Sequence, residues 1–149
     1  MEPWQLRRVR EYVEARIGGR ISISDLSGIA RLSEAHFSRG FKNTFGQTPH
    51  AYVMRRRVER ARHLMCVSDN SLSEIALACG FSDQAHFCRL FRRCIGQSPA
   101  AWRRRYWQQC GPVVSRDAHA YQALNLQQTA SRYKPMQSAQ RNLASHMTG

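Results

Sequence analysis

The sequence HFSRGF at residues 36–41 returns almost unchanged as HFCRLF at residues 86–91. The likeness continues downstream, where GQTP follows the first copy and GQSP follows the second at the same distance. Upstream, Ser33 aligns with Ser82, so the second copy contains one additional residue between this serine and its histidine. An internal repeat of this length indicates two copies of one supersecondary unit.

Each copy carries the signals of a short helix, a tight turn and a second helix. In the second copy, SLSE at 71–74 is a capping box, Gly80 is a turn residue, and Gly96 ends the second helix. Apolar side chains recur in each second helix at the spacing of one helical face. This face carries Phe87, Leu90, Phe91, Cys94 and Ile95 in the second copy, and Phe37, Gly40, Phe41, Thr44 and Phe45 in the first. The pattern predicts two helix-turn-helix units.

The opposite face of each second helix is basic. In the second copy this face carries Ala85, Arg89, Arg92 and Arg93 with His86 on its flank, and in the first Ala35, Arg39, Lys42 and Asn43 with His36 on its flank. One basic helix is equally compatible with a solvated surface. Two such helices, each second in a helix-turn-helix outline, favour a nucleic-acid partner.

A long helix is predicted between the two copies. Thr48 is a suitable N-cap, Pro49 is suited to the first helical position, and nothing breaks the helix up to residue 67. A helix of this length could hold two recognition helices about one DNA turn, roughly 34 Å, apart. Its RRRVERAR segment contains several cations, of which Arg55 and Arg56 are candidate phosphate ligands.

Composition and charge limit the possible partners and compartments. The 149-residue chain has 23 Lys and Arg against 10 Asp and Glu, a net charge of +13. A polyanion is therefore the expected partner, with an anionic membrane surface as the alternative. The five cysteines form no CxxC pair, which indicates reduced thiols. Because neither a signal peptide nor an apolar run of about 18 residues is found, we expect a soluble cytoplasmic protein that does not enter a membrane.

The repeat with GQTPHAY and GFSDQAHFCRLFRRCIGQSPAAWR, joined by RRRVERARHLM, resembles the DNA-binding domain of AraC/XylS-type transcription regulators over residues 5–106. The resemblance implies an all-α, homeodomain-like fold of about seven helices, whose two recognition helices enter successive major grooves of double-stranded DNA. Carried over by position, the base-reading residues are Ala35, Ser38, Arg39, Gln84, Ala85, His86, Cys88 and Arg89. The expected phosphate ligands are His36, Lys42, Asn43, Arg55, Arg56, Arg92 and Arg93. Arg89→Ala is expected to act at one base position, and Arg56→Ala to weaken all sequences alike.

The expected organisation has five parts. These are an N-terminal helix over 1–19, the first helix-turn-helix over 20–48, the linker helix over 49–67, the second helix-turn-helix with a closing helix over 68–107, and a disordered tail over 108–149. Since only one amphipathic helix precedes the first unit, the chain resembles the stand-alone family members, without an effector domain. This resemblance implies a transcription regulator that binds as a monomer and acts on RNA polymerase at promoters.

Two positions depart from the family pattern in the first unit. Arg31 stands where the second copy has Gly80, and a side chain there costs about 1 to 2 kcal/mol if the backbone is left-handed. Gly40 stands where the second copy has Leu90, and a glycine within a helix costs about 0.5 to 1 kcal/mol relative to alanine. We therefore expect the second unit to be better formed and to dominate sequence recognition.

The sequence disfavours some other functions and leaves others open. Catalysis is not expected, because the sequence offers no nucleophile with its base, no paired carboxylates and no metal ligands at suitable spacing, and no cofactor is implied. A thiol sensor is a minor alternative, with Cys88 or Cys110 as the accessible thiol and Cys94 on the buried face. A non-specific architectural nucleic-acid binder, or a fragment of a larger effector-responsive or DNA-repair-linked regulator, also remains open.

Overall fold

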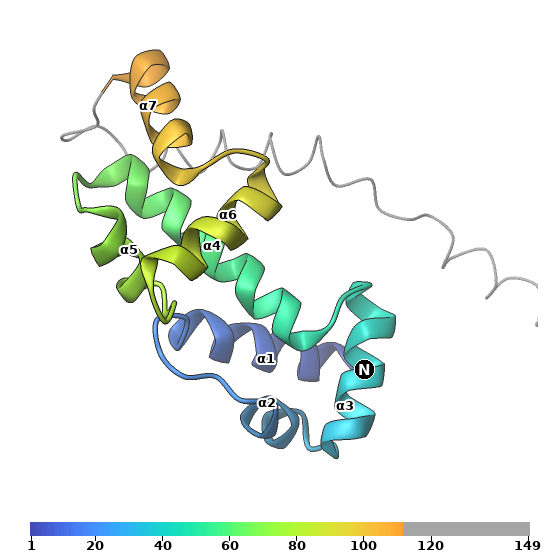
Figure 1. Ribbon diagram of the computed structural model, residues 1–149. Coiled ribbons are helices and arrows are strands. Elements are labelled where there is room, and N and C mark those ends of the chain that lie inside the picture. Colours follow the sequence, from blue (N-terminus) through green and yellow to red (C-terminus); the bar gives the residue numbers. More distant parts are fainter. Residues whose placement is uncertain (112–149) are drawn as a thin grey trace, which may run out of the picture. The chain divides into compact units, whose positions relative to one another are not determined.

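The computed structural model describes residues 1–111, and this part contains seven helices and no strand (Figure 1). The helices are α1 Pro3–Ala15, α2 Ile23–Ala30, α3 Glu34–Phe45, α4 Pro49–Val67, α5 Leu72–Ala78, α6 Gln84–Ile95 and α7 Pro99–Cys110. The predicted all-α fold with two helix-turn-helix units is confirmed. Helix α7 continues to Cys110, so the boundary expected at residue 107 was too early. The rest of the expected disordered tail, residues 112–149, lies outside the described residues.

The helices begin where the capping residues predict. Thr48 and Ser98 cap α4 and α7, each with proline at the first helical position. Ser71 and Glu74 form the expected capping box on α5. The first copy has the same box in Ser22 and Asp25, whose side chains exchange hydrogen bonds with each other's backbone amides at 3.1 and 2.9 Å. This second box departs from the usual sequence pattern, because aspartate replaces the usual Glu or Gln.

Two hydrophobic cores share α4. The first holds α1, α2 and α3 against the N-terminal half of α4, and the second holds α5, α6 and α7 against its C-terminal half (Figure 1). The aromatic repeat anchors each recognition helix: the Phe37 and Phe41 rings are 5.5 Å apart, and the Phe87 and Phe91 rings 5.6 Å. All four rings are fully buried, and half-buried Met54 packs against both cores. Each recognition helix is therefore fixed to its own core by the same two side chains.

The inserted residue of the second copy is Ser82. Arg31 and Gly80 both have left-handed backbones at the end of the first helix of their unit, which aligns these two positions. Ser33 and Asp83 each cap the following helix by accepting a hydrogen bond from the amide of its third residue. Ser33 therefore corresponds to Asp83. The alignment of the two copies by sequence, which paired Ser33 with Ser82, was wrong at this position. The turn of the second unit is longer by this one residue.

Arg31 has the left-handed backbone that its position in the repeat predicts. It is the only non-glycine residue with positive φ among residues 1–111, at 55°, and its side chain is exposed. Strain of this kind costs about 1 to 2 kcal/mol per residue. The first unit therefore carries a local backbone strain that glycine relieves in the second.

We expect Arg31→Gly to raise the free energy of unfolding by about 0.5 to 1 kcal/mol, because relief of strain exceeds the added flexibility of the unfolded chain. Urea denaturation measures this change. Arg31→Ala is the matched control, because it removes the same side chain and keeps the strained Cβ. An equal gain in both variants would assign the effect to the arginine side chain instead of the backbone.

Gly40 does not leave a void in the first unit. A Cβ atom at this position would lie 3.2 Å from Cγ of Met1, whose side chain is half-buried and packs against the first core. Met1 therefore occupies the space that a larger residue at position 40 would take. The packing deficit expected from the contrast with Leu90 is smaller than the sequence alone indicates.

Candidate nucleic-acid interface

The predicted base-reading residues all lie on accessible faces of α3 and α6. Exposed members are Ala35, Arg39, Gln84, Ala85 and Arg89, and half-buried members are Ser38, His86 and Cys88. Helical phase explains this, because the buried phenylalanines hold the opposite side of each helix in its core. Arg39 and Arg89 occupy equivalent places in the middle of the two outer faces. Both guanidinium groups are thus accessible to base edges in the major groove of a bound DNA.

Cations and polar groups surround these positions on both helices. His36, Lys42 and Asn43 on α3 are exposed, as are Arg92 and Arg93 on α6. Among the described residues, none of these side chains takes part in an ion pair, and neither do Arg39 and Arg89. The positive charges of the lysine and arginine side chains on these two faces therefore remain available to an external anion. Arg and Lys in such a setting are typical of a face that binds phosphate.

The start of α6 differs from the start of α3 in its polar contacts. The Asp83 carboxylate accepts a hydrogen bond of 2.7 Å from the His86 amide, which lowers the pKa of Asp83, with a smaller contribution from Arg89. The His86 ring places Nδ1 3.4 Å from Oγ of the inserted Ser82 and lies edge-on to Phe81. These contacts orient His86 at the N-terminal end of the recognition helix.

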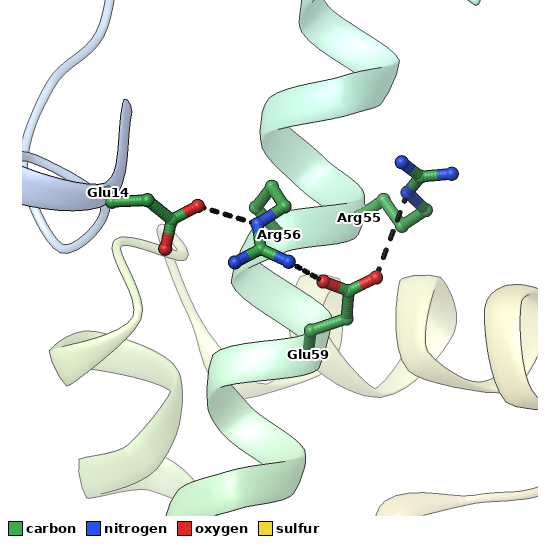
Figure 2. Close-up of polar contacts among 4 residues, drawn as sticks. All are labelled: Glu14, Arg55, Arg56 and Glu59. Carbon is green, nitrogen blue, oxygen red and sulfur yellow. Dashed lines mark hydrogen bonds and ion pairs between the residues drawn. The ribbon is translucent and has the colours of Figure 1, made fainter. Parts of the chain in front are cut away.

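Arg56 connects two helices instead of facing away from the protein. Its Nε donates to Oε1 of Glu14 on α1 at 2.6 Å, and its Nη1 contacts Glu59 on α4, which also pairs with Arg55 at 3.8 Å (Figure 2). The hydrogen bond to Glu14 is the main reason that the pKa of Arg56 is raised. Arg55 also lies over the Tyr52 ring, 5.7 Å from its centroid. Both arginines were expected to contact phosphate, and the structure gives both of them carboxylate neighbours.

We expect Arg56→Ala to lower the free energy of unfolding by about 0.5 to 1 kcal/mol, since it removes two partly exposed ion pairs, one between α1 and α4 and one within α4. Thermal denaturation at low and high salt measures this, and the difference should shrink at high salt. The comparison variant is Arg60→Ala, because Arg60 is exposed on the same helix and forms no ion pair among residues 1–111. Unchanged stability with uniformly weaker DNA binding would instead favour the phosphate role expected from the sequence.

Arg57 is the residue of this helix that sequence reasoning missed. Its side chain is only 8% exposed, its Nε donates to the Ile17 carbonyl at 3.1 Å, and its Nη2 donates to the Gly19 carbonyl at 2.6 Å. Burial lowers the pKa of Arg57 from its usual value. The signal was present in the helical periodicity, because Arg57 precedes the buried Ala61 and Met65 on one face of α4.

The cysteines do not favour a thiol sensor. None of the five forms a disulfide, and burial raises the pKa of Cys88 on the recognition helix, the reverse of what an activated thiol needs. Cys94 was expected on the buried face but is exposed, whereas the neighbouring Ile95 packs against the second core. Partial burial of its sulfur nevertheless raises the pKa of Cys94. Cys110 is exposed at the end of α7.

Neither a metal centre nor a membrane-spanning helix is found in residues 1–111. This part of the chain holds no group of three or more His, Cys, Asp or Glu residues placed to bind a metal ion. None of its helices combines the length and the apolar character needed to cross a membrane.

Comparison with known proteins identifies the family. Residues 26–105, more than half of the chain, match the family described as "Helix-turn-helix domain", and the similar solved structures include AraC-type DNA-binding domains. The chain belongs to the AraC/XylS-type helix-turn-helix family. The AraC/XylS-type resemblance expected from the sequence is therefore confirmed. The matched family and its relatives are transcription regulators and not enzymes.

Two relatives illustrate the extent of the sequence match. The probable transcriptional regulator LumQ of Photobacterium leiognathi is 38% identical over 77 residues, which are 52% of this chain and 31% of LumQ. The transcriptional activator Btr of Bacillus subtilis is 30% identical over 79 residues, which are 53% of this chain and 15% of Btr. The chain thus spans less than a third of the length of these relatives.

The match to two solved DNA-binding domains covers nearly the whole length of those domains. The DNA-binding domain of the global transcriptional factor AdpA, crystallised with a target DNA, has 29% identity and a TM-score of 0.67, covering 73% of this chain and 97% of that one. An AraC-type regulator from Chromobacterium violaceum has 31% identity and a TM-score of 0.66, covering 72% of this chain and 95% of that one. The described part of this chain therefore corresponds to one complete domain of this type.

Proposed function

We propose that the protein is a transcription regulator that binds double-stranded DNA sequence-specifically and reads two successive major-groove segments with α3 and α6. The observation that carries this proposal is the equivalence of the two helices. Each is anchored by two buried phenylalanines and presents an accessible arginine, Arg39 or Arg89, from the middle of its outer face. The DNA-bound AdpA domain, similar in fold, supports the same partner.

Base reading and phosphate binding are assigned to different side chains. Arg39 and Arg89 read guanine edges, for which the bidentate guanidinium is the commonest specific ligand. The other base-facing residues are Ala35, Ser38, Gln84, Ala85, His86 and Cys88. Phosphates are bound by His36, Lys42, Asn43, Arg92 and Arg93. Arg55 is a further phosphate ligand, although it also pairs with Glu59. Arg56 serves mainly to hold α1 to α4.

Selection from a random duplex library tests the proposal. The expected result is one enriched motif with two half-sites about 10 to 10.5 base pairs apart, because the two recognition helices belong to one chain and one face of the duplex. The control protein is Arg39→Ala combined with Arg89→Ala, which keeps the fold and should lose the enrichment. Equal affinity of the wild-type protein for all duplexes would indicate a non-specific architectural binder and contradict the proposal.

We further propose that one chain occupies each asymmetric site, acts in the cytoplasm and activates transcription through RNA polymerase. Two recognition helices in one chain already supply two half-site contacts, so a dimer is not needed. Analytical ultracentrifugation with the selected duplex should give one chain per duplex. Transcription in vitro with purified RNA polymerase should rise on promoters that carry the motif and stay unchanged on promoters that lack it.

A further inference from the structure

A second connection joins the two helix-turn-helix units besides α4. The segment between α1 and α2 in the first unit lies against the end of α5 in the second. A Cβ atom on Gly18 would lie 2.6 Å from the Ala78 carbonyl oxygen, closer than such contacts occur in proteins. The two backbones are therefore in direct contact, and only glycine at position 18 permits this approach.

The buried Arg57 side chain lies at the centre of this contact. From α4 it donates hydrogen bonds to the carbonyls of Ile17 and Gly19 in the first unit. On the side of the second unit it faces Gly80, where a Cβ atom would lie 2.9 Å from Cζ and Nη2 of Arg57 and 2.8 Å from the Ile17 carbonyl oxygen. One side chain of the shared helix α4 thus contacts both a loop of the first unit and the turn of the second unit.

The equivalent position of the first unit shows that this contact is not a general property of the turn. Arg31 adopts the same left-handed backbone as Gly80, but its side chain is exposed. The turn itself therefore tolerates a side chain. The close approach of Arg57 and Ile17 imposes the stricter requirement at position 80.

We propose that Gly18, Arg57 and Gly80 form a joint that sets the angle and distance between α3 and α6, and thereby selects the spacing of the two half-sites in DNA. These residues are positioning residues that act without touching DNA. The second half of this statement rests on the proposed function. The first half, the fixed orientation of the two units, does not.

The geometry of DNA makes spacing a sensitive measure of this joint. Each added base pair moves a half-site by about 3.4 Å along the duplex and rotates it by about 35°. A rigid pair of helices satisfies one spacing and loses one half-site at the others. A pair that rotates around α4 reaches several spacings with similar affinity, at a lower affinity for the best one.

The first experiment compares spacing selectivity. The probes are the duplex selected by the wild-type protein and versions with one base pair removed or with one or two added between the half-sites. Wild type should lose about 10-fold or more in affinity for each altered spacing, as expected when one specific half-site contact is lost. Arg57→Met should bind all four duplexes within about 3-fold of one another. It should still bind a duplex carrying only the α6 half-site as tightly as wild type.

The matched control is Arg60→Met, which removes one exposed arginine from the same helix and should keep the wild-type spacing profile. Arg57→Lys retains the charge and one of the two carbonyl contacts, and should be intermediate. If Arg57→Met has the same spacing profile as wild type, the proposal is overturned.

A second readout needs no DNA. Residual dipolar couplings of the full chain should fit one alignment tensor for both units in wild type and in Arg60→Met, and two different tensors in Arg57→Met. A single common tensor with unchanged orientation in Arg57→Met would overturn the joint. If Arg57→Met does not fold, Gly18→Ala is measured in the same way, since it separates the two backbones and leaves both cores intact. If wild type selects no sequence, the proposed function fails, and the couplings still decide whether the joint exists.

Discussion

Arg89→Ala is expected to weaken binding to the selected duplex by about 1 to 3 kcal/mol, or roughly 5- to 150-fold, and to relax the preference at one base position. Arg89 is exposed in the middle of the outer face of α6, and that helix is held by the buried Phe87 and Phe91. Loss of its guanidinium leaves a guanine edge without its two hydrogen bonds. Affinity for duplexes with every base at each half-site position measures both effects.

Arg92→Ala is the matched control on the same helix. Arg92 is exposed in the last turn of α6, where a phosphate contact is expected. This change should weaken all duplexes alike and reduce the slope of affinity against salt by about 1. Arg39→Ala tests the first unit, and its effect should be smaller than that of Arg89→Ala if the second unit dominates. If Arg89→Ala and Arg92→Ala behaved identically across sequences, the assignment of base-reading residues would be wrong.

Phe91→Ala is expected to lower the free energy of unfolding by about 3 to 5 kcal/mol, because it empties a large volume in the second core. The Phe91 side chain is 0% exposed, and its ring lies 5.6 Å from that of Phe87 and 6.1 Å from that of Trp102. Urea denaturation followed by tryptophan fluorescence measures the loss, since Trp102 reports on this core.

Leu90→Ala is the control for this change, because Leu90 directly precedes Phe91 on the same helix and is only half-buried. Its cost should be clearly smaller, since water already covers part of the removed surface. Phe41→Ala makes the equivalent deletion in the first unit and should cost a similar amount. Equal losses for Phe91→Ala and Leu90→Ala would contradict the assignment of the buried face of α6.

Local signals in the sequence were sufficient for the helices and their ends. Side-chain caps, prolines and glycines act within a few residues, so Ser71, Thr48 and Ser98 located helix starts that the structure confirms. The same holds for the buried phenylalanines of α3 and α6, which recur at helical spacing, but not for Cys94 and Thr44 on the same predicted faces, which are exposed. The site of the insertion was placed wrongly, because Ser82 resembles the capping Ser33 in type while Asp83 performs the capping.

The candidate interface was also only partly predictable from the sequence. Helical phase placed the predicted base-reading residues on accessible surfaces, which depends on a single helix and its core. It did not distinguish the three consecutive arginines of α4, because Arg56 and Arg57 have partners in other parts of the chain. Arg55 and Arg56 meet carboxylates, and Arg57 is buried against two carbonyls of the α1–α2 connection. Sequence separations of about 40 residues hide the contacts of Arg56 with Glu14 and of Arg57 with the two carbonyls from any local pattern, whereas the pairs with Glu59 lie within one turn of α4.

The sequence by itself determined two helix-turn-helix units, because the repeated phrase carries both its buried phenylalanines and its outward arginine within one helix. The tertiary structure alone decided the second contact between the two units, besides the linker helix that the sequence predicted. Arg31 and Gly80 occupy the same place in the repeat and share a left-handed backbone, yet only position 80 has no room for a side chain. The reason is physical: Arg57 and the Ile17 carbonyl approach Gly80 from parts of the chain that meet only after folding.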